Sequence, residues 1–361
     1  MLPTDFPGEK LVIKLWETLT EKGIGSLLMP WQTRRTDGTR IELRRREMLM
    51  LAQTEIDILE MRAGRKYLSD DGSLLTWPTP NSQSEELAHS AQKSQLRIGS
   101  LVERIIGNDA ANTMRQEINA SKAVLHAEEV LANDTQSPPD RAIDEDWVFR
   151  WRDYAGRVSN NELQELWGKI LAGEVKSPGA YSLRTLEFLR ELSKAEAERI
   201  TQLAKFAIER CVVRSASQYL EEHGISFDLL LEMQDLGVVS GVEALGLRRQ
   251  WMSTSSDRFI RALRSNGKVL VIEHEDADKT VTLDAYLLTN VGNELLGLGS
   301  FSPDVDYLRL VGETIAKQGF KVGLADWEQK TETEGRYFNR QNISDSEESA
   351  TGESVDLTDS S

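Results

Sequence analysis

Apolar residues recur at intervals of three and four along the N-terminal part of the chain, which is the spacing of one face of an α-helix. Residues 9–22 carry one such face. A second face predicts a helix of about 25 residues that ends near Lys66 and suits a helical bundle. The two faces consist of Leu11, Val12, Leu15, Trp16 and Leu19, and of Leu49, Ala52, Ile56, Leu59 and Ala63.

The same spacing continues over residues 86–132, where the weak helix formers at 107–109 predict a division into two helices. Small polar residues at several seam positions favour a helical hairpin packed on its neighbours over an exposed coiled-coil dimer. Turn-forming residues at 69–84 predict a linker. The Pro138-Pro139 pair marks the end of this helical region at about residue 137.

The strongest local signals lie in residues 144–192. Ser159 and Glu162 have the spacing of a capping box and predict that a helix starts at about Asn160, and Ser182 is suited to cap a second helix. Between them, the turn at 176–179 ends the first helix. Two short helices joined so closely are predicted to pack as a hairpin.

The run LWGKILAGEVKSPGAYSLRTL, residues 166–186, resembles the signature of the bacterial domain-of-unknown-function 2806 family. The usual pattern reads L-W-A-K-I-L-A-G-E, then P-G-S, then S-x-R-T-L, and here Gly168 and Ala180 replace the usual Ala and Ser. A looser likeness to the abortive-infection alpha family, through a Leu-Trp-x-x-Leu-Leu block, implies phage defence as a setting. The residues expected to form the structural signature are Trp147, Trp151, Trp167, Pro178, Gly179 and Arg184.

The period of the pattern changes after Cys211. Segments 268–275 and 280–287 are rich in β-branched residues and flank an acidic turn, which predicts a β-hairpin. The order helix, helix, small strand, hairpin and helix is typical of a winged-helix-like module, which is predicted at 216–325. The N-caps of the predicted helices in this half of the chain are Ser193, with Glu196 as a capping box, Ser226, Thr289 and Asp304.

Together these patterns predict a mainly α protein. Helical N-terminal and central regions, at 1–137 and 140–215, are followed by the small winged-helix-like α+β module. Residues 328–361 lack apolar periodicity and end in Ser, Asp and Glu, which predicts an acidic disordered tail.

Composition places the chain among ordinary globular proteins, with 39% hydrophobic and 28% charged residues. The net charge of −16 opposes nonspecific binding to nucleic acid over the whole surface. The single cysteine excludes an intramolecular disulfide and a cysteine metal cluster, and no signal segment is recognisable at the N-terminus. A cytoplasmic location is therefore expected, with contact to the inner membrane surface as an option.

The sequence offers few signs of catalysis. The two Gly-Lys pairs have Leu163 and Ala262 where a phosphate-binding loop needs its first glycine. The four histidines are not paired at a metal-ligand spacing. The acids at 144–146 suit a helix N-terminus better than a divalent metal site. We therefore expect no catalytic residue, metal or cofactor, although a site assembled from remote residues stays open.

The densest basic group lies near the N-terminus. Contact with phosphates of nucleic acid, contact with an anionic membrane, and pairing with neighbouring acids on a solvated helix are three competing interpretations. In the membrane interpretation, Leu15, Trp16 and Trp31 supply the apolar contacts and are equally candidates for partner contacts. The basic residues are Arg34, Arg35, Arg40, Arg44, Arg45 and Arg46.

A second basic group lies in the C-terminal half and is a candidate for contact with an anionic partner. The predicted helix at 227–236 carries acids instead of the basic or amide side chains that read DNA. A protein-contact role is therefore favoured over nucleic-acid binding. The basic residues are Arg248, Arg249, Arg258, Arg261 and Arg264.

The expected function is that of a non-enzymatic bacterial regulatory or effector protein that acts through protein–protein contacts, with anti-phage defence as the setting implied by the looser resemblance. A nucleic-acid-binding winged-helix regulator and a membrane-directed effector are the alternatives. A protein partner is expected, whereas nucleic acid, an anionic membrane and a homo-oligomer stay open as partners.

Overall fold

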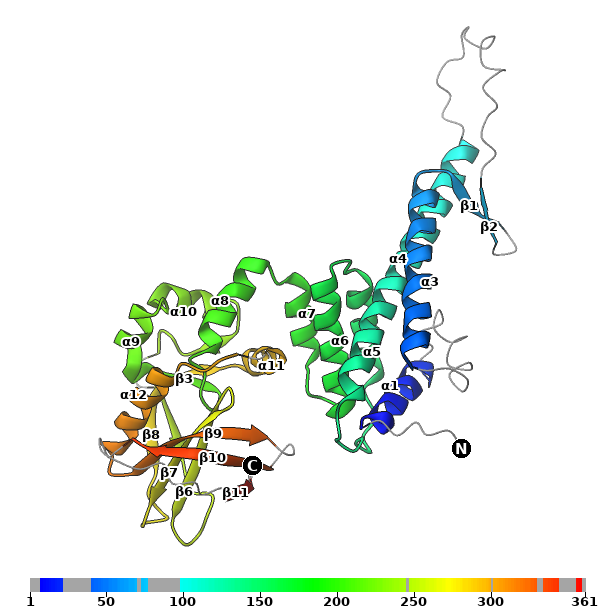
Figure 1. Ribbon diagram of the computed structural model, residues 1–361. Coiled ribbons are helices and arrows are strands. Elements are labelled where there is room, and N and C mark those ends of the chain that lie inside the picture. The colour runs from blue at the N-terminus through cyan, green and yellow to red at the C-terminus, as the bar shows by residue number, and fades with distance from the viewer. Residues whose placement is uncertain are drawn as a thin grey trace, which may run out of the picture. The chain divides into compact units, whose positions relative to one another are not determined.

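The computed structural model of the chain describes residues 7–21, 40–69, 73–76, 98–244, 247–299, 301–329, 334–343 and 355–358. The chain forms two compact units, residues 1–181 and residues 182–361. The boundary falls inside the 140–215 segment that the sequence predicts as a central domain. Figure 1 shows helices with the small β1–β2 pair in the first unit, and helices together with larger sheets in the second.

The first unit consists of helices and one small hairpin. Its elements are α1 (Glu9–Glu21), α3 (Arg40–Arg62), β1 (Lys66–Leu68), β2 (Leu74–Thr76), α4 (Ile98–Ala132), α5 (Glu145–Gly156) and α6 (Asn161–Lys176). Asp144 and Asn160 are the N-caps of α5 and α6, because each side chain accepts a hydrogen bond from a first-turn N–H. The cap of α6 is thus one residue beyond the predicted Ser159.

Two predictions for this unit were wrong. The helix α4 runs without a break through residues 107–109. Glycine and asparagine each cost about 1 kcal/mol or less in a helix, and burial of Ala111, Ile118 and Leu125 outweighs that cost. In addition, β2 lies within the predicted linker at 69–84 and pairs with β1 in an antiparallel hairpin.

The centre of the first unit is α4, against which α1, α3, α5 and α6 all pack. A buried amide network reinforces this packing: Asn119 Nδ2 donates to the carbonyl of Gly156 at 2.8 Å, and Gln164 Nε2 donates to Asn119 Oδ1 at 3.2 Å. The predicted apolar face of α1 is buried in the core at Leu11, Leu15 and Leu19, and α6 adds the buried residues Trp167, Ile170 and Leu171.

The close approach of α6 to α4 depends on Gly168. A Cβ atom there would lie 2.6 Å from His126 Cβ and 2.8 Å from the carbonyl oxygen of Ala123. We expect Gly168→Ala to lower the free energy of unfolding by about 1–2 kcal/mol, because overpacking exceeds the gain in helix propensity. Calorimetric unfolding checks this against Gly297→Ala in α11, where nothing lies within 4 Å and a gain of about 0.5–1 kcal/mol is expected. Equal gains in both variants would contradict the prediction.

The second unit begins with helices whose N-caps the sequence predicts correctly. Ser182, Ser226, Thr289 and Asp304 each accept a hydrogen bond from the backbone of the first turn, and Ser193 forms a capping box with Glu196. The helices are α7 (Leu183–Glu191), α8 (Lys194–Ala204), the 3₁₀ turn η1 (Arg214–Ala216), α9 (Ser217–Glu222), α10 (Phe227–Asp235), α11 (Asn290–Leu298) and α12 (Val305–Ala316). The helices α6 and α7 fall in different units, and α7 packs against α11.

Antiparallel sheets make up the rest of this unit. One sheet has five strands in the order β11-β10-β9-β7-β6, and in the other β8 pairs with β3, β4 and β5. The strands are β3 (Cys211–Val213), β4 (Val239–Ser240), β5 (Arg248–Trp251), β6 (Phe259–Ser265), β7 (Lys268–His274), β8 (Val281–Leu288), β9 (Lys321–Gln329), β10 (Glu334–Asn342) and β11 (Val355–Thr358).

The prediction of a mainly α chain with a small winged-helix-like module at 216–325 was therefore wrong. The two strands of the predicted hairpin lie in different sheets: β7 pairs with β6 and β9, whereas β8 pairs with β3, β4 and β5. Alternation along a strand shows that a segment is extended and half-buried, but it does not specify which strand becomes its neighbour. The extra strands β6, β9 and β10 turn the expected small module into a sheet-rich unit.

The prediction of a disordered tail over residues 328–361 was also wrong in part. Residues 334–342 form β10, and residues 355–358 form β11 at the edge of the five-stranded sheet. The buried ring of Tyr337 packs with Val269, Val271 and Ala325 on one face of that sheet. Backbone pairing and one aromatic anchor thus order a segment whose composition is mostly polar.

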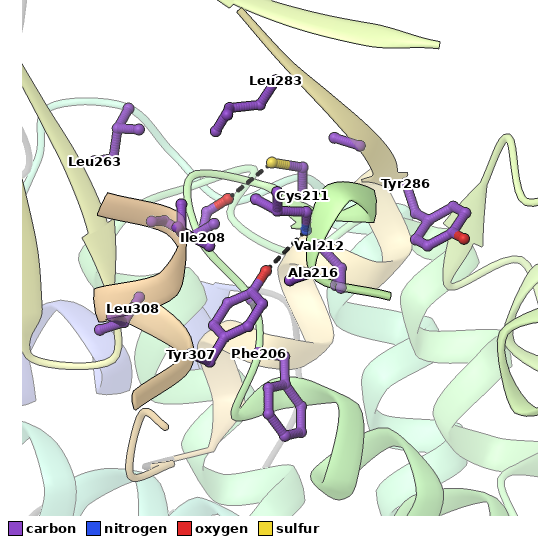
Figure 2. Packing of buried hydrophobic residues seen from close by; sticks show 14 of the residues in the cluster. Phe206, Ile208, Cys211, Val212, Ala216, Leu263, Leu283, Tyr286, Tyr307 and Leu308 are labelled. Carbon is purple, nitrogen blue, oxygen red and sulfur yellow. Dashed lines mark hydrogen bonds between the residues drawn. The ribbon is translucent and has the colours of Figure 1, made fainter. Parts of the chain in front are cut away.

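The main core of the second unit lies between the five-stranded sheet, the β8 sheet and α12. Figure 2 shows Tyr307 of α12 beside Phe206, with their ring centroids 5.4 Å apart. Cys211 is buried in the same core, where its Sγ donates to the carbonyl of Ile208. Burial raises the pKa of the Cys211 thiol to about 12, so this cysteine stays protonated and is a structural residue.

Candidate interaction surface

The three tryptophans of the signature form a structural cluster in the first unit. Trp151 Nε1 donates to the carbonyl of Trp167 at 2.9 Å, and Trp147 Nε1 donates to the carbonyl of Tyr181 at 2.7 Å. All three tryptophans are buried. The indole N–H groups of Trp151 and Trp147 hold α5 against α6 and against the turn after it.

That turn is held by a buried carboxylate which the sequence reasoning did not single out. Glu174 is only 1% exposed, and its two oxygens accept from the N–H groups of Gly179 at 2.5 Å and Tyr181 at 3.1 Å. Gly179 has a φ of +94°, which favours glycine. Pro178 precedes it in the turn and Arg184 is an exposed residue of α7. The signature from Glu174 to Tyr181 is therefore explained by folding.

We expect Glu174→Gln to lower the free energy of unfolding by about 1.5–3 kcal/mol, because the amide nitrogen cannot accept and leaves one of the two backbone N–H groups without its charged acceptor. Chemical denaturation measures the loss. The matched control is Glu165→Gln on the exposed side of the same helix, which should change stability by less than about 0.5 kcal/mol. Comparable losses in the two variants would show that the carboxylate does not hold the turn.

The acids at 144–146 have the helix-start role that the sequence favours. The Asp144 side chain accepts from Trp147 N at 3.0 Å, and Glu145 and Asp146 lie in the first turn of α5. Within the described ranges, no group of three or more His, Cys, Asp or Glu residues is placed to hold a metal ion.

The arginines of the C-terminal half do not form one basic face. Arg248 and Arg249 are neighbours on β5 and therefore point to opposite sides of that strand. Arg261 and Arg264, three positions apart on β6, also point to opposite sides. Several are already engaged: Arg248 pairs with Asp284 at 3.0 Å, and Arg264 pairs with Glu209 at 3.0 Å. The Arg249 guanidinium lies over the Trp251 ring, whereas Arg258 is exposed and Arg261 is partly buried.

The N-terminal candidates divide into buried residues and residues that the structure does not describe. Leu15 and Trp16 belong to the core of the first unit, so they are not available to lipid or to a partner in this fold. The backbone of α3 includes Arg40 and Arg44–Arg46, whose side chains are outside the described part. Arg34, Arg35 and Trp31 lie outside the described residues altogether.

A continuous apolar surface is present on α3. Leu49, Ile56 and Leu59 are 61%, 53% and 61% exposed, and the exposed Ala52 and Ala63 complete the row. We call these five residues the α3 stripe. The sequence predicts this row as a helical face suited to a bundle, and the structure places it on the outside of α3.

The opposite side of α3 is the side that packs. Leu51, Ile58 and Met61 are buried against α4, where they meet Ala111 and Ile118 among others. The helix α3 is thus apolar on two sides, and α4 covers only one of them. Such a helix usually has a second packing partner.

The margins of the α3 stripe carry charges that α4 holds in place. Glu55 accepts from Lys122 of α4 at 2.5 Å, and Arg62 donates to Asn112 of α4 at 2.7 Å. On the other margin lie Gln53 and Glu60. The surface is therefore an apolar row with fixed polar borders, which is the composition of a helix–helix interface.

No helix in the described part of the chain is long and apolar enough to cross a membrane. A comparison with curated proteins and with solved structures finds no match to the chain, and the expected likeness to the abortive-infection alpha family is not shown. A family model described as "Protein of unknown function (DUF2806)" matches residues 103–311. The match includes the buried signature and leaves the α3 stripe outside. The chain therefore belongs to the DUF2806 family.

Proposed function

We propose that this protein is a regulatory or effector component that works through protein–protein contacts, and that the α3 stripe makes one of these contacts. The observation that supports this function is the exposure of Leu49, Ile56 and Leu59 on a helix whose other apolar side is already packed. Fully burying a side chain of this size is worth about 1.5–3 kcal/mol and about half of each is still exposed, so the three together offer roughly 2–5 kcal/mol before the entropy cost of association.

The other candidate surfaces favour this proposal indirectly. The C-terminal arginines are spread over two strands and a loop, and two of them hold carboxylates, which weakens the case for a phosphate-binding face. The apolar side of α1 is buried in the core of the first unit. The α3 stripe is the one apolar helix face we find both exposed and continuous among the described side chains.

Site-specific photo-crosslinking in the host cell tests the proposal. A photoreactive phenylalanine analogue at position 56 is expected to form a covalent adduct with a protein, whereas the same analogue at the exposed position of Thr113 on α4 is expected to form little. Equal yields at both positions, or adducts only within one chain, would overturn the proposed contact role of the α3 stripe.

A further inference from the structure

We infer that the partner of the α3 stripe is a second copy of the same chain, bound with its α3 antiparallel to the first. This inference rests on the proposed function of the stripe as a contact surface. It adds the identity of the partner and the direction of the two helices, and both follow from the residues on and beside the stripe.

The spacing of the stripe is that of a coiled-coil seam. Its residues follow one another at intervals of three, four, three and four positions, so they occupy a and d positions of a heptad repeat. Two such seams interlock when helices pack side by side, and an identical helix supplies a seam of the same length and width. Each copy keeps its other apolar side on its own α4, so the paired α3 helices lie between two α4 helices.

The charges at the margins decide the direction. In a parallel pair, the g position of one helix meets the next e position of the other, which places Glu55 beside Glu60 of the second copy on both sides. Two pairs of carboxylates then face each other, and neither gains a new cation, because the cations already beside them, Lys122 at Glu55 and Arg65 at Glu60, belong to their own chain. A parallel arrangement is therefore disfavoured.

An antiparallel pair reverses this outcome. The register that sets Ile56 opposite Leu59 of the second copy also sets Ala52 opposite Ala63, so four layers of the seam match, and Leu49 falls opposite position 66, beyond the end of the second α3. In this register Glu55 faces Arg62 of the second copy, and by symmetry the same pair forms twice. The Glu55 side chain is 45% exposed, which leaves room for this second cation beside Lys122. On the other margin Gln53 faces Glu60, without repulsion.

The first test is the mass of the purified full-length chain in solution, measured by sedimentation over a wide range of concentration. We expect a concentration-dependent dimer. Each large apolar anchor in an interface is worth on the order of tenfold in Kd, so Ile56→Glu with Leu59→Glu should raise the Kd about a hundredfold or more. The matched control, Thr113→Glu with Asn161→Glu, adds the same charge at exposed positions of α4 and α6 and should leave the dimer intact.

The second test fixes the direction. Glu55→Arg places like charges opposite each other in the antiparallel dimer and should weaken it several-fold, and adding Arg62→Glu to the same chain should restore it. In a parallel dimer Glu55→Arg would instead strengthen association, which would overturn the antiparallel arrangement. Circular dichroism and hydrogen exchange of each variant report that α3 is still helical.

The outcomes separate the inference from the proposed function. A strictly monomeric chain whose position 56 crosslinks to a different protein would overturn self-association and keep the stripe as a contact surface. A dimer unaffected by Ile56→Glu with Leu59→Glu would also overturn the inference, because the copies would then meet elsewhere. Crosslinks from position 56 only to the same chain's own residues 77–97 would overturn both.

Discussion

Replacing Trp151 by alanine is expected to lower the stability of the first unit by about 3–5 kcal/mol, as is usual when a large buried aromatic side chain is removed. The side chain is completely buried, and its Nε1 donates to the carbonyl of Trp167. Since the free energy of unfolding of a single domain is only about 5–15 kcal/mol, the variant should retain little of the stability that keeps α5 packed on α6.

Hydrogen exchange measured by mass spectrometry checks this expectation. Peptides from α4, α5 and α6 should lose protection in Trp151→Ala, while peptides from the five-stranded sheet of the second unit should keep theirs. The matched variant Trp151→Phe keeps a six-membered ring in the core but removes the N–H donor and part of the buried ring volume, so it should lose less than the alanine variant, about 1–3 kcal/mol. Unchanged protection in the alanine variant would mean that the tryptophan cluster does not hold the first unit together.

Replacing Tyr307 by alanine is expected to destabilise the second unit to a similar extent, about 3–5 kcal/mol. Tyr307 is fully buried in the core between α12 and the sheets, and its hydroxyl accepts from the N–H of Val213 in β3 at 2.8 Å. Burial raises the pKa of the Tyr307 phenol above its usual range, so the side chain stays neutral. Tyr307 thus contributes both its packing in the core and a hydrogen-bond acceptor for a buried backbone N–H.

The variant Tyr307→Phe separates these two contributions. It keeps the ring beside Phe206 and removes only the acceptor, so we expect a loss of about 1–3 kcal/mol in the free energy of unfolding. Calorimetry of the two variants should therefore rank them clearly, with the alanine variant the weaker. If phenylalanine cost as much as alanine, the hydrogen bond to Val213 would carry the effect and the packing in Figure 2 would not.

The α3 stripe shows that a helical pattern identifies which residues share a face, but not which face becomes buried. The sequence shows that Leu49, Ile56 and Leu59 share one face, and that this face suits packing between helices. It does not show that Leu51, Ile58 and Met61, on another side of the same helix, are the residues that meet α4. A helix with two apolar sides has two ways to pack, and only the position of α4 decides which side remains exposed.

Among the other candidate residues, roles set by neighbours close in the sequence could be predicted, whereas roles set by packing between distant segments could not. The structural role of the tryptophans and of the acids at 144–146 could be predicted, because caps and helical periods are local. The burial of Leu15 and Trp16 could not be predicted, since it depends on the packing of α1 against α4 and α6, far along the chain. The role of Glu174 was missed because a charged residue inside a helix carries no local sign of burial.

Local patterns in the sequence predict the N-terminal starts of α5, α7, α8, α10, α11 and α12, the helical faces of the first unit and the family of the chain. These features follow from interactions within a few residues, which a sequence displays directly. Packing between distant segments places β7 and β8 in different sheets, adds strands from the polar tail to one sheet edge, and leaves the α3 stripe facing outward. The partner of a strand, and the segment that packs on a helix face, are the distant segments with which the most apolar surface is buried. The spacing of residues along the chain does not show which segments these are.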